Sequence, residues 1–277
     1  MSSLKRNIPN KSDIEAALNL IKYAEHNAAF SSEPLVEAAL NRSDDEKSAL
    51  DYLLISTDYW KNGEYEKSLR NAYTGVALNS SDTRVKASLE LRLGTVFQDL
   101  GSEDRSWELA EKCFNEAIEI DKSFPLSYVF AGDLQFDLGE YDDAEELYQK
   151  ARQMDVNDPA TYNSLGYLYL EQERNKEAEE AFRAAEKLEP ELPIVHLHLA
   201  TLFQEQGRND EAVEEFEKAI AMYPENALWY CHLSMLLLEL KQFDKAEDVI
   251  KKAKKISPKN ETVLSVVKEI KKLKKLK

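Results

Sequence analysis

Turn-forming residues are scarce in this chain of 277 residues, which has only eight glycines and eight prolines. A β-rich protein needs many turns, so the scarcity favours long helices. The two cysteines, Cys113 and Cys231, are too few and too far apart for a disulfide framework or a metal cluster. No stretch approaches the roughly 18 apolar residues of a membrane span, and the start, MSSLKRNIPNKSD, lacks the apolar run of a secretory leader. These absences predict a helical protein in a reducing, cytoplasmic setting.

Positive charge is also scarce, except at the C-terminal end. The net charge is −16. From Lys251 onward, eleven lysines stand against Glu261 and Glu269, a charge of +9, which leaves −25 on residues 1–250. A largely acidic chain is poorly suited to binding nucleic acid along its length. The charge therefore favours a basic or neutral protein partner and predicts no nucleic acid partner.

The prolines that are present reveal a repeat. Six of the eight fall into two series with a step of 34 residues, namely Pro125, Pro159 and Pro193, and Pro190, Pro224 and Pro258. Proline is tolerated in the first helical turn and after a helix end, so the two series mark helix boundaries. Gly132 and Gly166 keep the same step, and a four-residue insertion separates Gly94 and Gly101 from this register.

Aligning the chain at this period brings residues of the same kind into phase. Residues 159–192 hold, in order, Tyr162, Leu165, Gly166, Tyr169, Ala178, Phe182, Ala185 and Pro190. The pattern resembles that of the tetratricopeptide-repeat (TPR) family, and it recurs in neighbouring segments. The resemblance implies an all-α, right-handed superhelical solenoid of helix-turn-helix hairpins. One such hairpin cannot bury its apolar face alone, so neighbouring hairpins must stack.

The predicted organisation has three parts. Six repeats occupy 49–82, 83–124, 125–158, 159–192, 193–226 and 227–260. Residues 1–48 form a lead and a helical hairpin or cap outside the repeat register. Within it, Ser12 and Glu15 predict a capping box, a shorter helix begins near 32–34, and Ser43 with Glu46 predicts the cap of the first repeat helix. Residues 261–277 form a basic capping helix, for which contact with a membrane surface or with an acidic neighbour are alternatives.

The resemblance also implies where a partner binds, because positions 5, 9, 12 and 13 of each repeat line the concave face in the TPR family. The predicted peptide-binding groove comprises Trp60, Gln98, Asp133, Phe136, Asn163, Tyr167, Leu170, Thr201, Gln204, Met235 and Leu238. An acidic row at position 13 edges it, made of Asp99, Asp137, Glu171, Glu205 and Glu239. An apolar floor with an acidic edge suits a basic or apolar amphipathic peptide or helix. The alternative is that the acids only solvate this face and the apolar groups pack between repeats.

Two other binding or catalytic classes are disfavoured. Some TPR cochaperones hold a chaperone's C-terminal carboxylate with a basic clamp, and only Asn163 matches that clamp here. There is no glycine-rich phosphate loop, and His196, His198 and His232 lack further converging metal ligands. We therefore predict no catalytic residue, no metal and no cofactor.

The sequence thus predicts a non-enzymatic scaffold or adaptor that binds another protein. Three alternatives stay open. The first is an assembly factor or chaperone for a secretion or membrane complex, which would use the same groove. The second is self-assembly, with the +9 tail of one copy meeting the acidic body of another. The third and least favoured is an enzyme with an unrecognised site.

Overall fold

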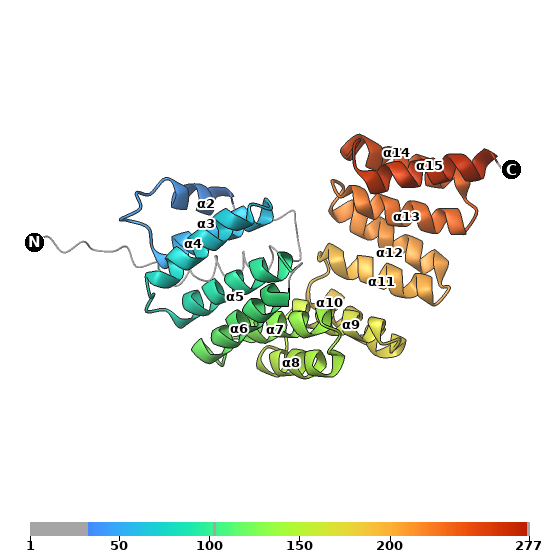
Figure 1. Cartoon of the computed structure of the whole chain (residues 1–277). Coiled ribbons are helices and arrows are strands. Elements are labelled where there is room, and N and C mark those ends of the chain that lie inside the picture. The colour runs from blue at the N-terminus through green and yellow to red at the C-terminus, as the bar shows by residue number, and fades with distance from the viewer. Residues whose placement is uncertain (1–32, 102–103, 276–277) are drawn as a thin grey trace, which may run out of the picture. The chain divides into compact units, whose positions relative to one another are not determined.

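A computed structural model of the chain describes residues 33–101 and 104–275 (Figure 1). These residues form α-helices joined by short turns and contain no strand, so the predicted all-α class is confirmed. Helix α2 (Glu33–Leu40) begins where a short helix is predicted. The capping box of Ser12 and Glu15 lies outside the described residues.

After α2 the helices follow one another in pairs. Their bounds are α3 Ala49–Lys61 and α4 Tyr65–Ala77; α5 Thr83–Asp99 and α6 Asp104–Ile120; α7 Pro125–Asp137 and α8 Tyr141–Met154; α9 Pro159–Glu171 and α10 Asn175–Leu188; α11 Pro193–Glu205 and α12 Asn209–Met222; α13 Ala227–Glu239 and α14 Phe243–Ile256; and finally α15 Glu261–Lys275. Three first helices begin at a proline, and Pro190, Pro224 and Pro258 each lie just beyond the end of a second helix. The prediction that prolines mark helix boundaries is confirmed.

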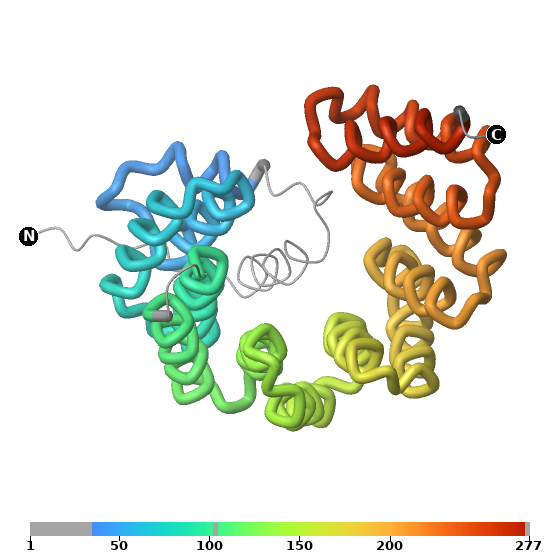
Figure 2. Tube along the Cα trace, turned by 45° about the vertical axis from the view of Figure 1, so that its right-hand side comes forward, coloured from blue at the N-terminus to red at the C-terminus, as the bar shows by residue number. Residues whose placement is uncertain are grey.

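The chain divides between Leu168 and Tyr169 into two units, here called the N-terminal and the C-terminal unit. In the N-terminal unit each helix from α3 to α8 packs on its neighbours in sequence, and first helices also touch, α3 with α5 and α5 with α7. The C-terminal unit repeats this arrangement from α10 onward, and its last helix, α15, packs against both α13 and α14 (Figure 2). First helices therefore lie side by side within each unit.

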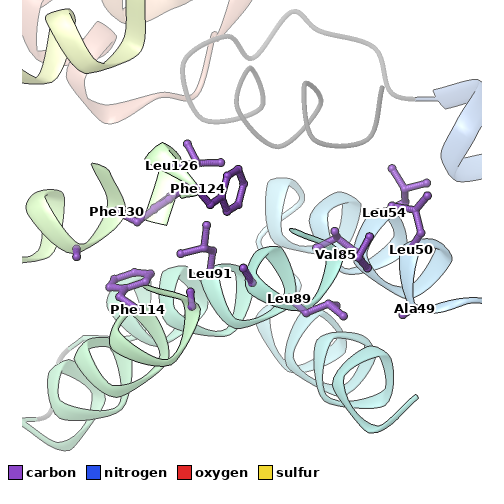
Figure 3. Packing of buried hydrophobic residues seen from close by; sticks show 14 of the residues in the cluster. Ala49, Leu50, Leu54, Val85, Leu89, Leu91, Phe114, Phe124, Leu126 and Phe130 are labelled. Carbon is purple, nitrogen blue, oxygen red and sulfur yellow. The ribbon is translucent and has the colours of Figure 1, made fainter. Parts of the chain in front are cut away.

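The core of the N-terminal unit runs continuously through several helices. Figure 3 shows apolar side chains of four helices converging on one layer, among them Leu50, Leu54, Val85, Leu89, Leu91, Phe114, Leu126 and Phe130. The rings of Phe114 and Phe130 stack with centroids 5.9 Å apart, which ties α6 to α7. In the C-terminal unit Phe182, Phe203 and Phe216 are fully buried. Burial of such apolar area is the dominant favourable contribution to folding.

A small residue lets the two helices of a pair approach closely. A Cβ atom added to Gly94 would lie 2.3 Å from the Phe114 ring, and one added to Gly132 would lie 2.6 Å from the Tyr148 ring. In the first pair the equivalent contact is polar. There the Ser56 and Ser68 hydroxyls each donate to the other residue's carbonyl oxygen at 2.8 Å. The predicted pairing of small and large residues thus has a direct steric basis.

The cap predicted for the first repeat helix at Ser43 and Glu46 is wrong. Ser48 is the N-cap of α3, and it forms a capping box in which Asp51 N–H donates to Ser48 Oγ at 3.3 Å and Ser48 N–H donates to Asp51 Oδ2 at 2.8 Å. Ser43 does donate to Glu46, from its hydroxyl at 2.7 Å, but these residues form a turn before the helix. Both segments have the spacing of a capping box, and only the second leads directly into the apolar run.

A buried cluster of charges stabilises the C-terminal unit. His196 Nδ1 lies 2.7 Å from Glu215 Oε2, and Nε2 lies 3.2 Å from the carbonyl oxygen of Pro190. Both partners only accept hydrogen bonds, so both ring nitrogens carry protons and the imidazole is positively charged. Burial lowers the pKa of His196, but these hydrogen bonds outweigh burial and raise it above 6.5. Burial would raise the pKa of Glu215, yet its bonds to His196 and Lys218 lower it to about 2.

We expect Gly94→Val to destabilise the N-terminal unit by about 1–3 kcal/mol, because the added methyl groups displace the Phe114 ring in a packed core. The measurement is the urea midpoint followed by circular dichroism, with hydrogen exchange in α5 and α6 to localise the effect. Ala221→Val, at an exposed position of α12, controls for the helix propensity of valine. An unchanged midpoint for Gly94→Val would contradict the steric argument.

The charge cluster makes stability depend on pH. Since the folded pKa of His196 is raised above 6.5, its contribution is complete below pH 6.5 and is lost as pH rises through the raised value. Since the folded pKa of Glu215 is about 2 against 4.5, its contribution is present above pH 4.5 and is lost as pH falls toward 2. The cluster should therefore stabilise most between pH 4.5 and 6.5.

The variant Glu215→Gln should lose about 3–5 kcal/mol, because it leaves buried cations without their anion. Its urea midpoint should also fall less steeply than that of the natural chain above pH 6.5. Glu217→Gln, two residues on and exposed, should leave the profile unchanged. An equally steep decline in Glu215→Gln would show that His196 is not the group that titrates.

Candidate functional site

The first helices α3, α5, α7, α9, α11 and α13 carry the residues of the predicted groove. Numbering each repeat along its first helix, position 12 of one repeat reaches position 13 of the next. Gln98 Nε2 donates to Asp137 Oδ2 at 2.6 Å in the N-terminal unit, and Gln204 Nε2 donates to Glu239 Oε2 at 2.9 Å in the C-terminal unit. We call each such line between neighbouring first helices a seam. A carboxylate of the acidic row therefore also links two helices.

Trp60 belongs to the same series of contacts. Its Nε1 donates to Asp99 Oδ2 at 2.5 Å, and its ring lies 4.3 Å from the guanidinium carbon of buried Arg92. Burial raises the pKa of Asp99, against the bond from Trp60 and the charge of Arg92, which lower it. Trp60 thus stabilises the seam between α3 and α5.

Glu171 and Glu205 follow a position 12 that has no donor, because the preceding residues there are Phe136 and Leu170. Both glutamates are exposed. The pKa of Glu205 is raised by partial burial and then by the negative charges of Glu171 and Glu173. Negative charge is therefore concentrated on this part of the C-terminal unit.

An aromatic cluster lies beside Asp137 in the N-terminal unit. The Phe136 ring lies 5.2 Å from that of Tyr167 and 5.4 Å from that of Tyr141, and Tyr167 is 37% exposed. Close by, Asp133 accepts a hydrogen bond of 2.7 Å from the Tyr148 hydroxyl. Burial raises the pKa of Asp133 to about 7, although that hydrogen bond lowers it. The cluster offers apolar rings next to a carboxyl group.

Not every predicted groove residue lies at the surface. Asn163 and Leu170 are buried. Thr201 is half-buried and donates to the carbonyl oxygen of Leu197 at 3.1 Å. Among the described residues, Tyr167 and Met235 are the predicted apolar groove residues that are most exposed, Met235 at 48%.

A hollow of about 530 Å³ lies between α13 and α15. It is lined by three predicted residues, Met235, Leu238 and Glu239, and by Thr262, Ser265, Val266, Glu269 and Leu273 of the last helix. The sequence analysis assigned α15 only to capping or an outside contact, so it missed these five. The signal was present, because α15 begins 34 residues after α13 and continues the repeat register.

Residues with ligand-type atoms come together around His196, where atoms of Glu186, His196 and Glu215 lie within 4.8 Å of one another. The cluster does not fit a metal ion, because a metal ligand needs an unprotonated ring nitrogen and both nitrogens of His196 are donors. Its other cations are Arg183, 3.4 Å from Glu215, and Lys218, 2.9 Å from Glu215. The cluster is a network of ion pairs.

The sequence analysis also missed Glu215 as a partner of His196. The available signal was a pair of exceptions in one repeat. His196 stands where the other repeats have Tyr52, Tyr128, Tyr162 and Tyr230, and Glu215 stands where they have Leu147, Ala181 and Val249. Two polar residues at apolar positions of one hairpin indicate that they face each other.

No helix within residues 33–101 and 104–275 is long and apolar enough to cross a membrane. Comparison of structures finds the same fold in several proteins. A chain in the crystal structure of the APC/C hetero-tetramer Cut9-Hcn1 is 16% identical, with a TM-score of 0.71, over 93% of this chain and 48% of that chain. The present chain thus spans about half the length of that relative.

Two further structures match over nearly their whole length. A tetratricopeptide repeat protein from Parabacteroides merdae is 16% identical, with a TM-score of 0.62, over 94% of this chain and 98% of that one. The pilF protein of Pseudomonas aeruginosa is 18% identical, with a TM-score of 0.59, over 84% and 99%. At these identities the likeness is one of fold.

No curated protein sequence matches the chain. A family model described as "Cilia and flagella-associated protein 70 C-terminal domain" matches residues 17–270. That range includes helices α2 to α14 and most of α15. The chain therefore belongs to the family of the cilia and flagella-associated protein 70 C-terminal domain, a family of TPR domains.

Proposed function

We propose that this chain is a non-enzymatic scaffold that binds a basic, amphipathic peptide or helix of a partner protein on its first helices. The observation that carries the proposal is the same in both units. Exposed carboxylates at position 13 lie next to exposed apolar side chains, Asp137 beside the Phe136 and Tyr167 rings and Glu239 beside Met235. Charge complementarity of this kind steers encounter, and apolar anchors supply affinity.

The charge of the chain supports a basic partner. Residues 1–250 carry −25, and within the C-terminal unit Glu171 and Glu205 are close enough to raise the pKa of Glu205. A cation placed between them would relieve this repulsion, whereas an acidic peptide would add to it.

Electrostatic self-assembly through the lysine-rich tail has less support. The Lys274 ammonium already lies 2.8 Å from Asp244 and 2.5 Å from Glu247 in its own C-terminal unit. A tail lysine that is paired within its own chain contributes little attraction to a second copy.

The first test uses a fluorescein-labelled helical peptide of roughly 16 residues, with leucines at i, i+3, i+4 and i+7 and lysines elsewhere. Fluorescence anisotropy should detect its binding, whereas a peptide with glutamates in place of lysines should not bind. Glu171→Lys with Glu205→Lys should weaken binding about tenfold, or ~1.4 kcal/mol. Glu180→Lys with Glu214→Lys, at exposed positions of α10 and α12, changes the net charge equally and should leave binding within twofold. Equal losses from the two pairs would reduce the effect to net charge and contradict the proposal.

The aromatic cluster gives a second test in the N-terminal unit. Tyr167→Ala removes an exposed ring that stacks on Phe136, so the peptide should bind about tenfold more weakly, or ~1.4 kcal/mol. Tyr73→Ala is the matched control, because Tyr73 is an aromatic residue with 52% exposure on the second helix α4. If both variants bind the peptide as the natural chain does, the cluster is not an anchor.

A further inference from the structure

Helix α15 has the register of a first helix. It begins 34 residues after α13, so Ser265, Glu269 and Leu273 fall at positions 5, 9 and 13. Position 8, which holds a small residue in the preceding repeats, is Lys268 here, and it is exposed. A lysine at this point cannot accept the close packing of a second helix. Helix α15 is therefore the first helix of a further repeat and carries no second helix on this surface.

The side of α15 that faces α13 differs from every seam described above. At those seams a donor at position 12 bonds a carboxylate at position 13. Between α13 and α15 the corresponding residues are Leu238 and Leu273, and neither can form a hydrogen bond. The hollow of about 530 Å³ opens at this point.

The walls of the hollow are fixed in place. Val263, Val266 and Ile270 are buried, the Val263 N–H donates to Asn260 Oδ1 at 3.1 Å, and Lys274 pairs with α14. The helix is thus anchored by burial, by its N-terminal cap and by an ion pair at its other end. A rigid wall keeps the hollow formed without a ligand, which lowers the ordering cost of binding.

The lining has two kinds of side chain. Met235, Leu238, Val266 and Leu273 make it mainly apolar, and Met235 is 48% exposed. Glu239 and Glu269 contribute the charges, and both are negative and exposed. The volume falls within the range of about 300–1,000 Å³ that holds ligands. This combination suits apolar side chains accompanied by a cation.

We propose that α15 is a wall of a binding pocket, which receives two apolar side chains from one face of a partner helix. A lysine or arginine one turn away on that helix reaches Glu239 or Glu269. Neighbouring side chains at i and i+3 or i+4 lie on one helix face, which matches the elongated space between two helices. This inference rests on the proposed function and adds the place and chemistry of one anchor.

The test uses the full chain with ¹³C-labelled methionine methyl groups and the leucine–lysine peptide as probe. We expect the Met235 methyl resonance to shift on titration, whereas those of Met154 and Met222, on the second helices α8 and α12, stay in place. Ser265→Trp, which fills the hollow from an exposed position, should weaken peptide binding at least tenfold. Leu264→Trp, also exposed but outside the lining, is the matched control and should bind normally.

The outcomes separate the pocket from the general function. A fixed Met235 resonance and full binding by Ser265→Trp, together with weak binding by Glu171→Lys and Glu205→Lys, would overturn the pocket and leave the scaffold function intact. If the peptide fails to bind even the natural chain, both proposals fail. A circular dichroism spectrum and melting midpoint like those of the natural chain are required of each variant, so that a loss of binding cannot arise from unfolding.

Discussion

A large ring of the second helix lies directly on a small residue of the first, and the arrangement of each hairpin depends on this contact. At Gly94 and Gly132 there is no room for even a Cβ atom beside the rings of Phe114 and Tyr148. The close approach fixes which face of the first helix is covered by its own partner. The remaining faces must then cover the neighbouring hairpin or meet solvent, so stacking follows from the same contact.

The seams between first helices decide what the uncovered faces can do. A carboxylate that accepts a bond from Gln98 or Gln204 holds two helices together and still gives the surface negative charge. The acidic row therefore combines the two readings that the sequence left open, namely a structural part and an electrostatic surface. Which part a given acid plays depends on whether position 12 of the preceding repeat can donate.

The fold was predictable because proline, glycine and the aromatic residues repeat in phase over several hairpins. Periodic signals of this kind survive single departures, such as Ser68, which the structure accommodates through its bonds with Ser56. Local choices were harder to predict. Ser43 and Ser48 both have the spacing of a capping box, and only the start of the packed helix distinguishes them. Contacts between positions with no family precedent, such as His196 with Glu215 or Leu238 with Leu273, depend on side chains meeting across helices, which a single pattern does not specify.

The pairing of positions 12 and 13 has a consequence for how such arrays diverge. A polar pair makes the junction stiff and closed, and an aliphatic pair makes it open and receptive, while the backbone keeps the same spacing. A few substitutions at these two positions could thus move a socket from one junction to another along the array. The unpaired leucines at the end of this chain place the socket where only one neighbour must be held, so gaining a binding cavity there costs the least cohesion.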